Sequence, residues 1–196
     1  AWVRFVPDNI TNTQLGVSTD EERYKVINFV YGYTYTADAQ GDPSEKREWI
    51  LGDIIHSEPT IIDYLDENND LYRRLIVVGG NDGMLHVFYD DDDGTILSMK
   101  NAANFTEQYI PGRELWAFIP PDLMPKLKLL PDFSDHEYFV DGFSSLKRAR
   151  YTFWKTGDDA ASGPTGDTRV APRVAGEYYQ KTLVFGERRG GEYYWA

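Results

Sequence analysis

Every side chain of Asp66-Glu-Asn-Asn-Asp70 carries oxygen, and three of them have the spacing of a calcium-binding loop. Asp66, Asn68 and Asp70 stand at positions i, i+2 and i+4, so a turn that wraps around an ion would bring their oxygens together. The motif is incomplete, because Leu71 replaces the glycine at its sixth position and Val77 replaces the glutamate at its twelfth. Two interpretations stay open: a calcium site made by these three side chains, or a solvated connection between strands.

A second oxygen-rich turn lies at Asp90–Asp93, directly before Gly94. Four adjacent carboxylates repel one another, so this turn either collects a cation or stays fully exposed to water. Exposure is the preferred interpretation.

Three histidines are the other candidates for chemistry. Asp53, His56 and Glu58 have the residue types of an acid–base or metal cluster, and alternation along a strand puts only His56 and Glu58 on one face. A structural interpretation is preferred, with Asp53 in a turn and His56 hydrogen-bonded to a neighbouring structural unit. His86, between apolar neighbours, is expected to be a buried neutral side chain bonded to backbone. His136, in an acidic loop, is expected to be exposed.

The sequence contains no sign of a catalytic nucleophile. It has no cysteine, and no Ser/His/Asp order with a strained nucleophile turn is visible. Gly79-Gly80 and Gly190-Gly191 are not phosphate-binding loops, because neither precedes a helix or a Lys-Ser/Thr pair. These observations predict a protein that is not an enzyme.

Composition limits the partners. A net charge of −12 and an isoelectric point near 4.6 argue against nucleic acid, which needs clustered Lys and Arg, and against charge-driven adhesion to anionic membranes. No apolar run approaches 18 residues, so no transmembrane segment is predicted. The charge suits a surface exposed outside the cell or in the periplasm, although ordinary acidic solubility explains it equally well.

One helix and a series of strands are predicted to position these residues. Ser18-Thr-Asp-Glu21 has the form of a capping box and predicts a helix over 19–31. Residues 34–47 are polar and predict a loop. The later β-strand and short-helix predictions cover residues 59–64, 74–79, 84–89, 114–119, 123–130, 143–153, 181–186 and 192–196.

The two hairpin-like segments at 75–89 and 181–196 recur 107 positions apart, with Gly79 matching Gly186 and Gly83 matching Gly190. Each would be the inner half of a four-stranded antiparallel sheet, which is how a β-propeller blade is built. We therefore predict an all-β chain, a partial β-propeller with quinoprotein-like blades and long insertions, preceded by a short helical segment. Residues 1–48 form the helical lead-in and linker, and 49–196 the first blades. The chain is expected to be an excerpt of a longer protein.

Three ordered motifs carry a resemblance to a known family. They begin at Trp49 (WILGDIIHSEP), Val78 (VGGNDGMLHVF) and Glu114 (ELWAFIPP). In this order they resemble the C-terminal propeller of the type IV pilus tip adhesins and biogenesis factors, the PilC/PilY family. The resemblance continues through Tyr138-Phe-Val-Asp-Gly142 to the end of the chain.

The resemblance implies a secreted protein of the fimbrium, exposed at the cell surface and pilus tip after export through the periplasm and outer membrane. It implies a role in pilus assembly, in capping the fibre tip with minor pilins and in opposing retraction, with a variable N-terminal region that contacts a host or abiotic surface. Calcium is the cofactor it implies, through an Asp-rich loop that usually lies beyond the last residue of this sequence.

The sequence also allows two alternatives to a pilus role. The segment from Tyr89-Asp90 to Gly112-Arg-Glu-Leu-Trp116 resembles the blade signature of quinoproteins, which would make the chain part of a dehydrogenase dependent on pyrroloquinoline quinone. Such an enzyme also needs calcium and a catalytic Asp at the ring centre. The second alternative is a propeller scaffold for outer-membrane assembly.

Overall fold

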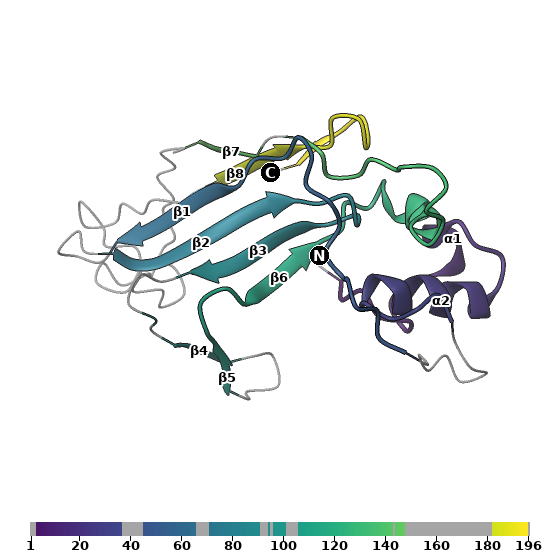
Figure 1. The fold of residues 1–196 in the computed structure, drawn as a ribbon, viewed down its shortest axis with the longest axis horizontal. Coiled ribbons are helices and arrows are strands. Elements are labelled where there is room, and N and C mark those ends of the chain that lie inside the picture. The colour runs from purple at the N-terminus through teal and green to yellow at the C-terminus, as the bar shows by residue number, and fades with distance from the viewer. Residues whose placement is uncertain are drawn as a thin grey trace, which may run out of the picture.

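Antiparallel sheets dominate the computed structural model, and two helices lie at one end of them (Figure 1). The structure describes residues 3–36, 45–65, 71–90, 94, 96–100, 106–142, 144–147 and 182–195. All structural statements below concern these residues.

The predicted helix forms at the expected place. α1 (Asn12–Leu15) is a single turn, and α2 (Asp20–Val30) begins after Thr19, whose side chain accepts a hydrogen bond from the backbone of Glu22. In return, the backbone N–H of Thr19 donates to Oε2 of Glu22. The capping box therefore begins at Thr19, one residue later than the sequence pattern suggests. Three acidic residues in the first turn further stabilise the positive end of the helix dipole.

The first sheet has four antiparallel strands in the order β1-β2-β3-β6. Their bounds are β1 (Thr60–Leu65), β2 (Leu71–Gly79), β3 (Leu85–Asp90) and β6 (Glu114–Phe118). Gly79 pairs with Leu85, so β2 and β3 form the predicted hairpin around a turn at residues 80–84. Its Gly83 has φ +96°, a conformation that glycine adopts without a steric penalty.

A separate hairpin stands between β3 and β6. It consists of β4 (Leu97–Lys100) and β5 (Thr106–Tyr109), which pair only with each other. The sequence predicted long insertions between strands, and this hairpin lies in one of them, between the strands expected at 84–89 and 114–119; the sequence analysis assigned no strands to it.

The second sheet repeats the antiparallel order with three strands: β7 (Ser144–Lys147), β8 (Thr182–Gly186) and β9 (Tyr194–Trp195). Gly186 pairs with Tyr194, eight residues later, whereas Gly79 pairs with Leu85, six residues later. The second turn is therefore two residues longer, and the constant offset of the sequence comparison ends at this turn.

One face of the first sheet carries the core and meets the second sheet. Cross-strand register places Ile62, Leu75, Val77 and Val87 on this face, and β7 lies against β1 and β2. Phe118 at the end of β6 contacts two rings of the second sheet edge to face, Phe185 at 6.1 Å and Trp195 at 5.9 Å. The two sheets therefore stack face to face around a shared apolar core.

A 3-10 helix, η1 (Met124–Leu129), joins the helical segment to the sheets. Leu15 of α1 and Leu127 of η1 are both buried in the core, and the Lys128 ammonium donates to the carbonyl of Gly16 at 2.6 Å. The sequence predicted a short helix over residues 123–130, and the structure places it there with the tighter 3-10 winding.

Strands make up most of the regular structure and helices are few, which agrees with the predicted all-β character. Across the described ranges no sheet closes on itself, and the two stacked sheets do not form a ring. The division into 1–48 and 49–196 stays a prediction.

Candidate functional site

The predicted calcium ligands Asp66, Asn68 and Asp70 lie outside the described residues, so the calcium hypothesis stays a prediction. The same holds for residues 91–93 of the second acidic turn. Within the described ranges, no group of three His, Asp or Glu side chains is arranged to hold a metal ion.

His86 lies between two carboxylates in the first sheet. Its Nε2 is 3.0 Å from each carboxylate oxygen of Asp82, in the β2–β3 turn, and its Nδ1 is 2.6 Å from Oε1 of Glu114 on β6. The ring is 4% exposed and stacks on Phe88 at 5.9 Å. The expectation of a neutral histidine bonded to backbone is therefore wrong, because the turn and the neighbouring strand each bring a carboxylate to the ring.

The charge of the His86 ring follows from these contacts. Burial disfavours the charged form and is the largest single influence, but the hydrogen bonds and negative charges of Asp82 and Glu114 outweigh it and raise the pKa of His86 from 6.5 to about 9. Both ring nitrogens then donate, so His86 is an imidazolium at neutral pH. A buried cation paired in this way holds the turn and β6 to β3.

Asp82 also fixes the segment that precedes β1. Its Oδ2 accepts the backbone N–H of Gly52 at 2.8 Å, and its Oδ1 accepts that of Met84 at 3.2 Å. The second contact is an Asx-turn, which shapes the hairpin turn locally. One buried carboxylate thus organises the turn, the histidine and the approach to β1.

His56 and Asp53 have separate partners, so the imagined Asp53–His56–Glu58 cluster does not form. His56 Nδ1 is 2.8 Å from Oδ2 of Asp141, and its backbone N–H donates to Oδ1 of the same residue at 3.2 Å. Asp53 instead lies 2.8 Å from Nε2 of His136. Because Asp141 precedes β7, His56 is bonded to the second structural unit, as predicted. His136 is partly exposed, also as predicted.

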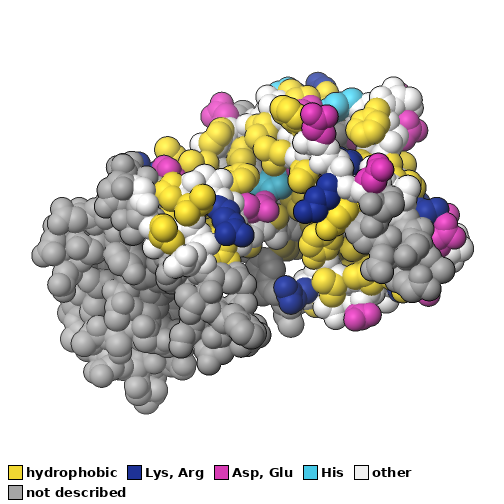
Figure 2. All heavy atoms as spheres, turned by 60° about the horizontal axis from the view of Figure 1, so that its bottom comes forward, with side chains coloured by type: hydrophobic (Ala, Val, Ile, Leu, Met, Phe, Trp, Pro, Cys, Tyr) yellow, Lys and Arg dark blue, Asp and Glu magenta, His cyan; other side chains and the backbone are white. Residues whose placement is uncertain are grey.

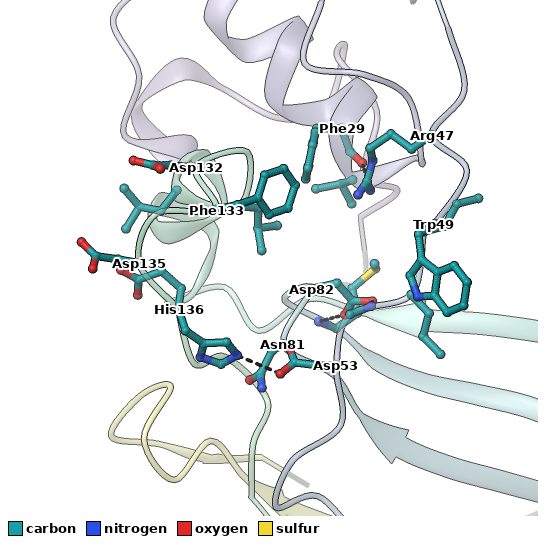
Figure 3. A pocket seen from close by; sticks show the side chains of 18 residues that line it. Phe29, Arg47, Trp49, Asp53, Asn81, Asp82, Asp132, Phe133, Asp135 and His136 are labelled. Carbon is teal, nitrogen blue, oxygen red and sulfur yellow. Dashed lines mark hydrogen bonds and ion pairs between the residues drawn. The ribbon is translucent and has the colours of Figure 1, made fainter.

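A hollow of about 500 Å³ lies between α2 and the β2–β3 turn (Figure 3). We call it the helix–sheet groove. It is lined by two stretches of chain, within 47–53 and 129–137, and by parts of α2 and the turn. The lining residues are Phe29, Val30, Arg47, Trp49, Ile50, Leu51, Gly52, Asp53, Asn81, Asp82, Met84, Leu129, Leu130, Asp132, Phe133, Asp135, His136 and Glu137.

Aromatic side chains stand on opposite sides of the groove (Figure 3). Trp49 is 80% exposed and Phe133 is 82% exposed, although Phe133 lies 6.5 Å from the ring of Phe29. Ile50 and Leu51 beside Trp49 are also exposed. Figure 2 shows hydrophobic side chains gathered over the described part of one face of the molecule, with charged groups between them.

Arg47 closes one end of the groove and fixes the end of α2. Its guanidinium donates to the carbonyls of Phe29 at 2.8 Å and Tyr33 at 3.2 Å, and it stacks over the Phe29 ring at 3.8 Å. Partial burial lowers the pKa of Arg47, and the charge of Asp82 opposes that shift. A cation at this place stabilises the carbonyl end of the helix.

Sequence reasoning did not find the groove. The apolar run Trp49-Ile-Leu51, which lies outside any strand, is the one local sequence pattern that indicates the groove. No local pattern indicates that Arg47, Asp82 and Phe133 line it, because they come together only through tertiary structure.

The described fold belongs to the class of stacked antiparallel β-sheets with polar contacts at their turn ends. The chain is 28% identical over 163 residues to the type IV pilus biogenesis factor PilY1 homolog of Xylella fastidiosa (strain Temecula1). The similarity covers 70% of this chain and 11% of that protein, so the chain spans only a small part of the length of this relative. It relates the chain to the type IV pilus biogenesis factors.

No family model matches the chain, and no solved structure matches it. In the portion of the chain that the structure describes, every helix is too short or too polar to cross a membrane.

Proposed function

We propose that the chain is a non-enzymatic part of a type IV pilus biogenesis factor. The similarity to the PilY1 homolog is the observation that carries this proposal. In this role the protein acts outside the cell, at the cell surface and the pilus tip. It works there with minor pilins to promote assembly, cap the fibre and oppose retraction, and another part of the protein contacts a host or abiotic surface.

The same proposal assigns the two sheets to the first blades of a β-propeller. Face-to-face stacking of antiparallel sheets supports this assignment. The uncovered face of the first sheet supports it as well, because Ile61 is 56% exposed there and Phe88 is only partly buried. A further blade would cover these side chains. The proposal includes calcium as a structural ion held by Asp66, Asn68 and Asp70.

Genetic complementation tests the pilus role. We expect a strain that lacks the full-length gene to lose surface pili, and an in-frame deletion of residues 49–196 not to restore them. If the protein opposes retraction, pili return when the retraction motor is also removed. Normal piliation of the deletion strain would contradict the proposal.

The quinoprotein alternative is tested on the purified full-length protein. Pyrroloquinoline quinone and calcium are added, and the bound quinone is measured by its absorbance and the activity by dye reduction with alcohols and sugars. We expect neither. An outer-membrane assembly scaffold would instead alter the amounts of outer-membrane proteins while pili stay normal.

A further inference from the structure

We propose that the helix–sheet groove binds an extended polypeptide segment in which apolar residues are flanked by lysine or arginine. This inference rests on the groove alone and does not depend on the proposed pilus role. Three properties of the groove point to such a partner: its exposed aromatic walls, its open form and the sign of its unpaired charge.

The aromatic walls provide the apolar contact. Trp49 and Phe133 leave 80% and 82% of their surface in water, and large aromatic side chains stabilise a complex most strongly when a partner covers them. The adjacent Ile50 and Leu51 extend the apolar surface along the chain. Exposed apolar patches of this kind mark interaction sites more often than isolated surface side chains do.

The open form of the groove favours a chain over an enclosed small molecule. A volume of about 500 Å³ is within the range of ligand sites, but small-molecule sites bury most of the ligand. Here the two aromatic side chains remain almost fully exposed on opposite sides (Figure 3). An extended segment lying between Trp49 and Phe133 contacts both walls and leaves its ends in water.

The charges select a basic partner. The groove is lined by five carboxylates, but His86 pairs with Asp82, His136 with Asp53 and Lys126 with Glu137. These pairings leave Asp132 and Asp135. Both are exposed, and no ion pair reaches them from the described residues. Their carboxylates lie at the outer edge of the groove and point away from the cavity (Figure 3), and Oδ1 of Asp132 accepts the backbone N–H of Ser134 at 2.9 Å.

The basic side of the lining is already engaged. Arg47 donates to two carbonyls at the end of α2, so its charge is directed at the helix and less at a ligand. An acidic peptide would meet Asp132 and Asp135 unfavourably at the edge of the groove, whereas Lys or Arg residues that flank the apolar part of a peptide would meet them there favourably.

Fluorescence anisotropy with the purified full-length protein tests the proposal. The probe is a labelled 12-residue peptide of alternating Leu and Lys. Two matched peptides replace its Lys with Glu or its Leu with Ser. We expect binding of the Leu/Lys peptide, weaker at high salt, and no measurable binding of either matched peptide.

Variants locate the binding. Phe133→Ser should weaken binding about tenfold or more, and Asp132→Asn with Asp135→Asn should weaken it roughly three- to tenfold. The control for the aromatic change is Tyr194→Ser, because Tyr194 is 84% exposed outside the groove. The control for the charge change is Asp8→Asn with Glu192→Gln, which alters the net charge equally at exposed positions. Neither control should change the affinity by more than twofold.

Four results would overturn the proposal: no binding of the Leu/Lys peptide, equal binding of the Leu/Glu peptide, equal losses in the groove and control variants, or a dimer in sedimentation that Phe133→Ser dissociates. The last result would identify a second copy of the chain as the occupant. Because the readout is peptide affinity, failure here leaves the pilus role untouched, and loss of piliation leaves the groove proposal untouched.

Discussion

The ring of His86 on β3 donates through Nδ1 to Oε1 of Glu114 on β6 at 2.6 Å, while its Nε2 bonds Asp82 in the β2–β3 turn. Both ring nitrogens therefore face carboxylates, and the ring is charged although it is buried. The edge strand is thus held to the hairpin by an ion pair in addition to backbone hydrogen bonds. A buried charge held in this way makes stability depend on pH.

We expect the free energy of unfolding to fall in alkaline solution because of His86. The folded pKa is about 9 and the ordinary value is 6.5, so the stabilising contribution is complete below pH 6.5, declines between pH 6.5 and 9, and is absent above that. A shift of this size corresponds to roughly 3–4 kcal/mol. Urea denaturation at pH 6 and pH 9.5 measures the difference.

The variant His86→Gln isolates this effect. It should lower stability at pH 6 and remove most of the difference between the two pH values, because glutamine does not titrate. Glu114→Gln is the milder comparison, since the Glu114 side chain is 44% exposed. An unchanged pH profile in His86→Gln would contradict the assignment.

Asp141 is expected to hold the two sheets together through His56. Its side chain is fully buried and accepts both the backbone N–H and the ring of His56. Asp141→Leu removes both acceptors and leaves the backbone N–H of His56 without its partner, at a cost of about 2–4 kcal/mol.

The control is Asp141→Asn, which retains one oxygen for the backbone N–H and should cost less. Hydrogen exchange provides the sharper measurement, because amides of β7 and β8 should exchange faster in Asp141→Leu than those of β2 and β3. Equal acceleration in both sheets would show that Asp141 does not act between them.

Gly142 lies in the segment that leads into β7, and its lack of a side chain lets this segment approach the backbone of β8 at Gly186. A Cβ at this position would overlap the backbone carbonyl of Gly186. Because the overlapping atoms belong to the backbone and not to a flexible side chain, they cannot easily move aside. We expect Gly142→Ala to cost roughly 2–3 kcal/mol, measured by thermal unfolding. Gly112→Asn is the matched control, because Gly112 has φ +85° with no atom near its Cβ position and asparagine tolerates that conformation. Similar losses in both variants would refute the close-approach argument.

Calcium removal tests the ligand set predicted from Asp66, Asn68 and Asp70. If the three oxygens hold an ion, chelation of the full-length protein should lower its melting temperature and added calcium should restore it. Asp70→Asn should weaken binding in calorimetry, because it removes one ligand charge. Asp8→Asn is the control at an exposed position. Calorimetry without a calcium signal at any concentration would remove the ion from the proposal.

Local patterns predicted the elements well because their causes are local. The hairpin of β2 and β3 followed from β-branched runs around turn-forming glycines, and α2 followed from its capping box. His86 was misjudged for the opposite reason. Its apolar neighbours indicated burial correctly, but Glu114 lies 28 residues away in sequence and reaches the ring only through strand pairing.

The helix–sheet groove illustrates the same limit. Trp49 and Phe133 are 84 residues apart in sequence, and neither has a periodicity that predicts a shared cavity. The sequence predicts that His56 forms a hydrogen bond to a neighbouring unit, which agrees with its contact to Asp141. Its partner could not be named, because the packing of β7 on β1 decides it.

Arg47 is expected to stabilise the packing of the end of α2 against the segment that precedes β1. Its planar guanidinium donates to the carbonyls of Phe29 and Tyr33 and stacks on the Phe29 ring. Lysine keeps the charge but cannot stack in this way or reach both carbonyls at once. We therefore expect Arg47→Lys to lower stability by about 1–2 kcal/mol and to increase hydrogen exchange of the amides in the last turn of α2.

Arg4→Lys is the matched control for this change, because Arg4 is exposed and lies outside the groove. The groove gives a second readout. If Arg47 acts by fixing the end of α2, Arg47→Lys should also weaken binding of the Leu/Lys peptide. If Arg47 instead repels the peptide directly, Arg47→Gln, which removes the cation, should strengthen that binding. Unchanged exchange in α2 of Arg47→Lys, together with tighter peptide binding by Arg47→Gln, would show that Arg47 acts on the ligand through its charge and not through the helix.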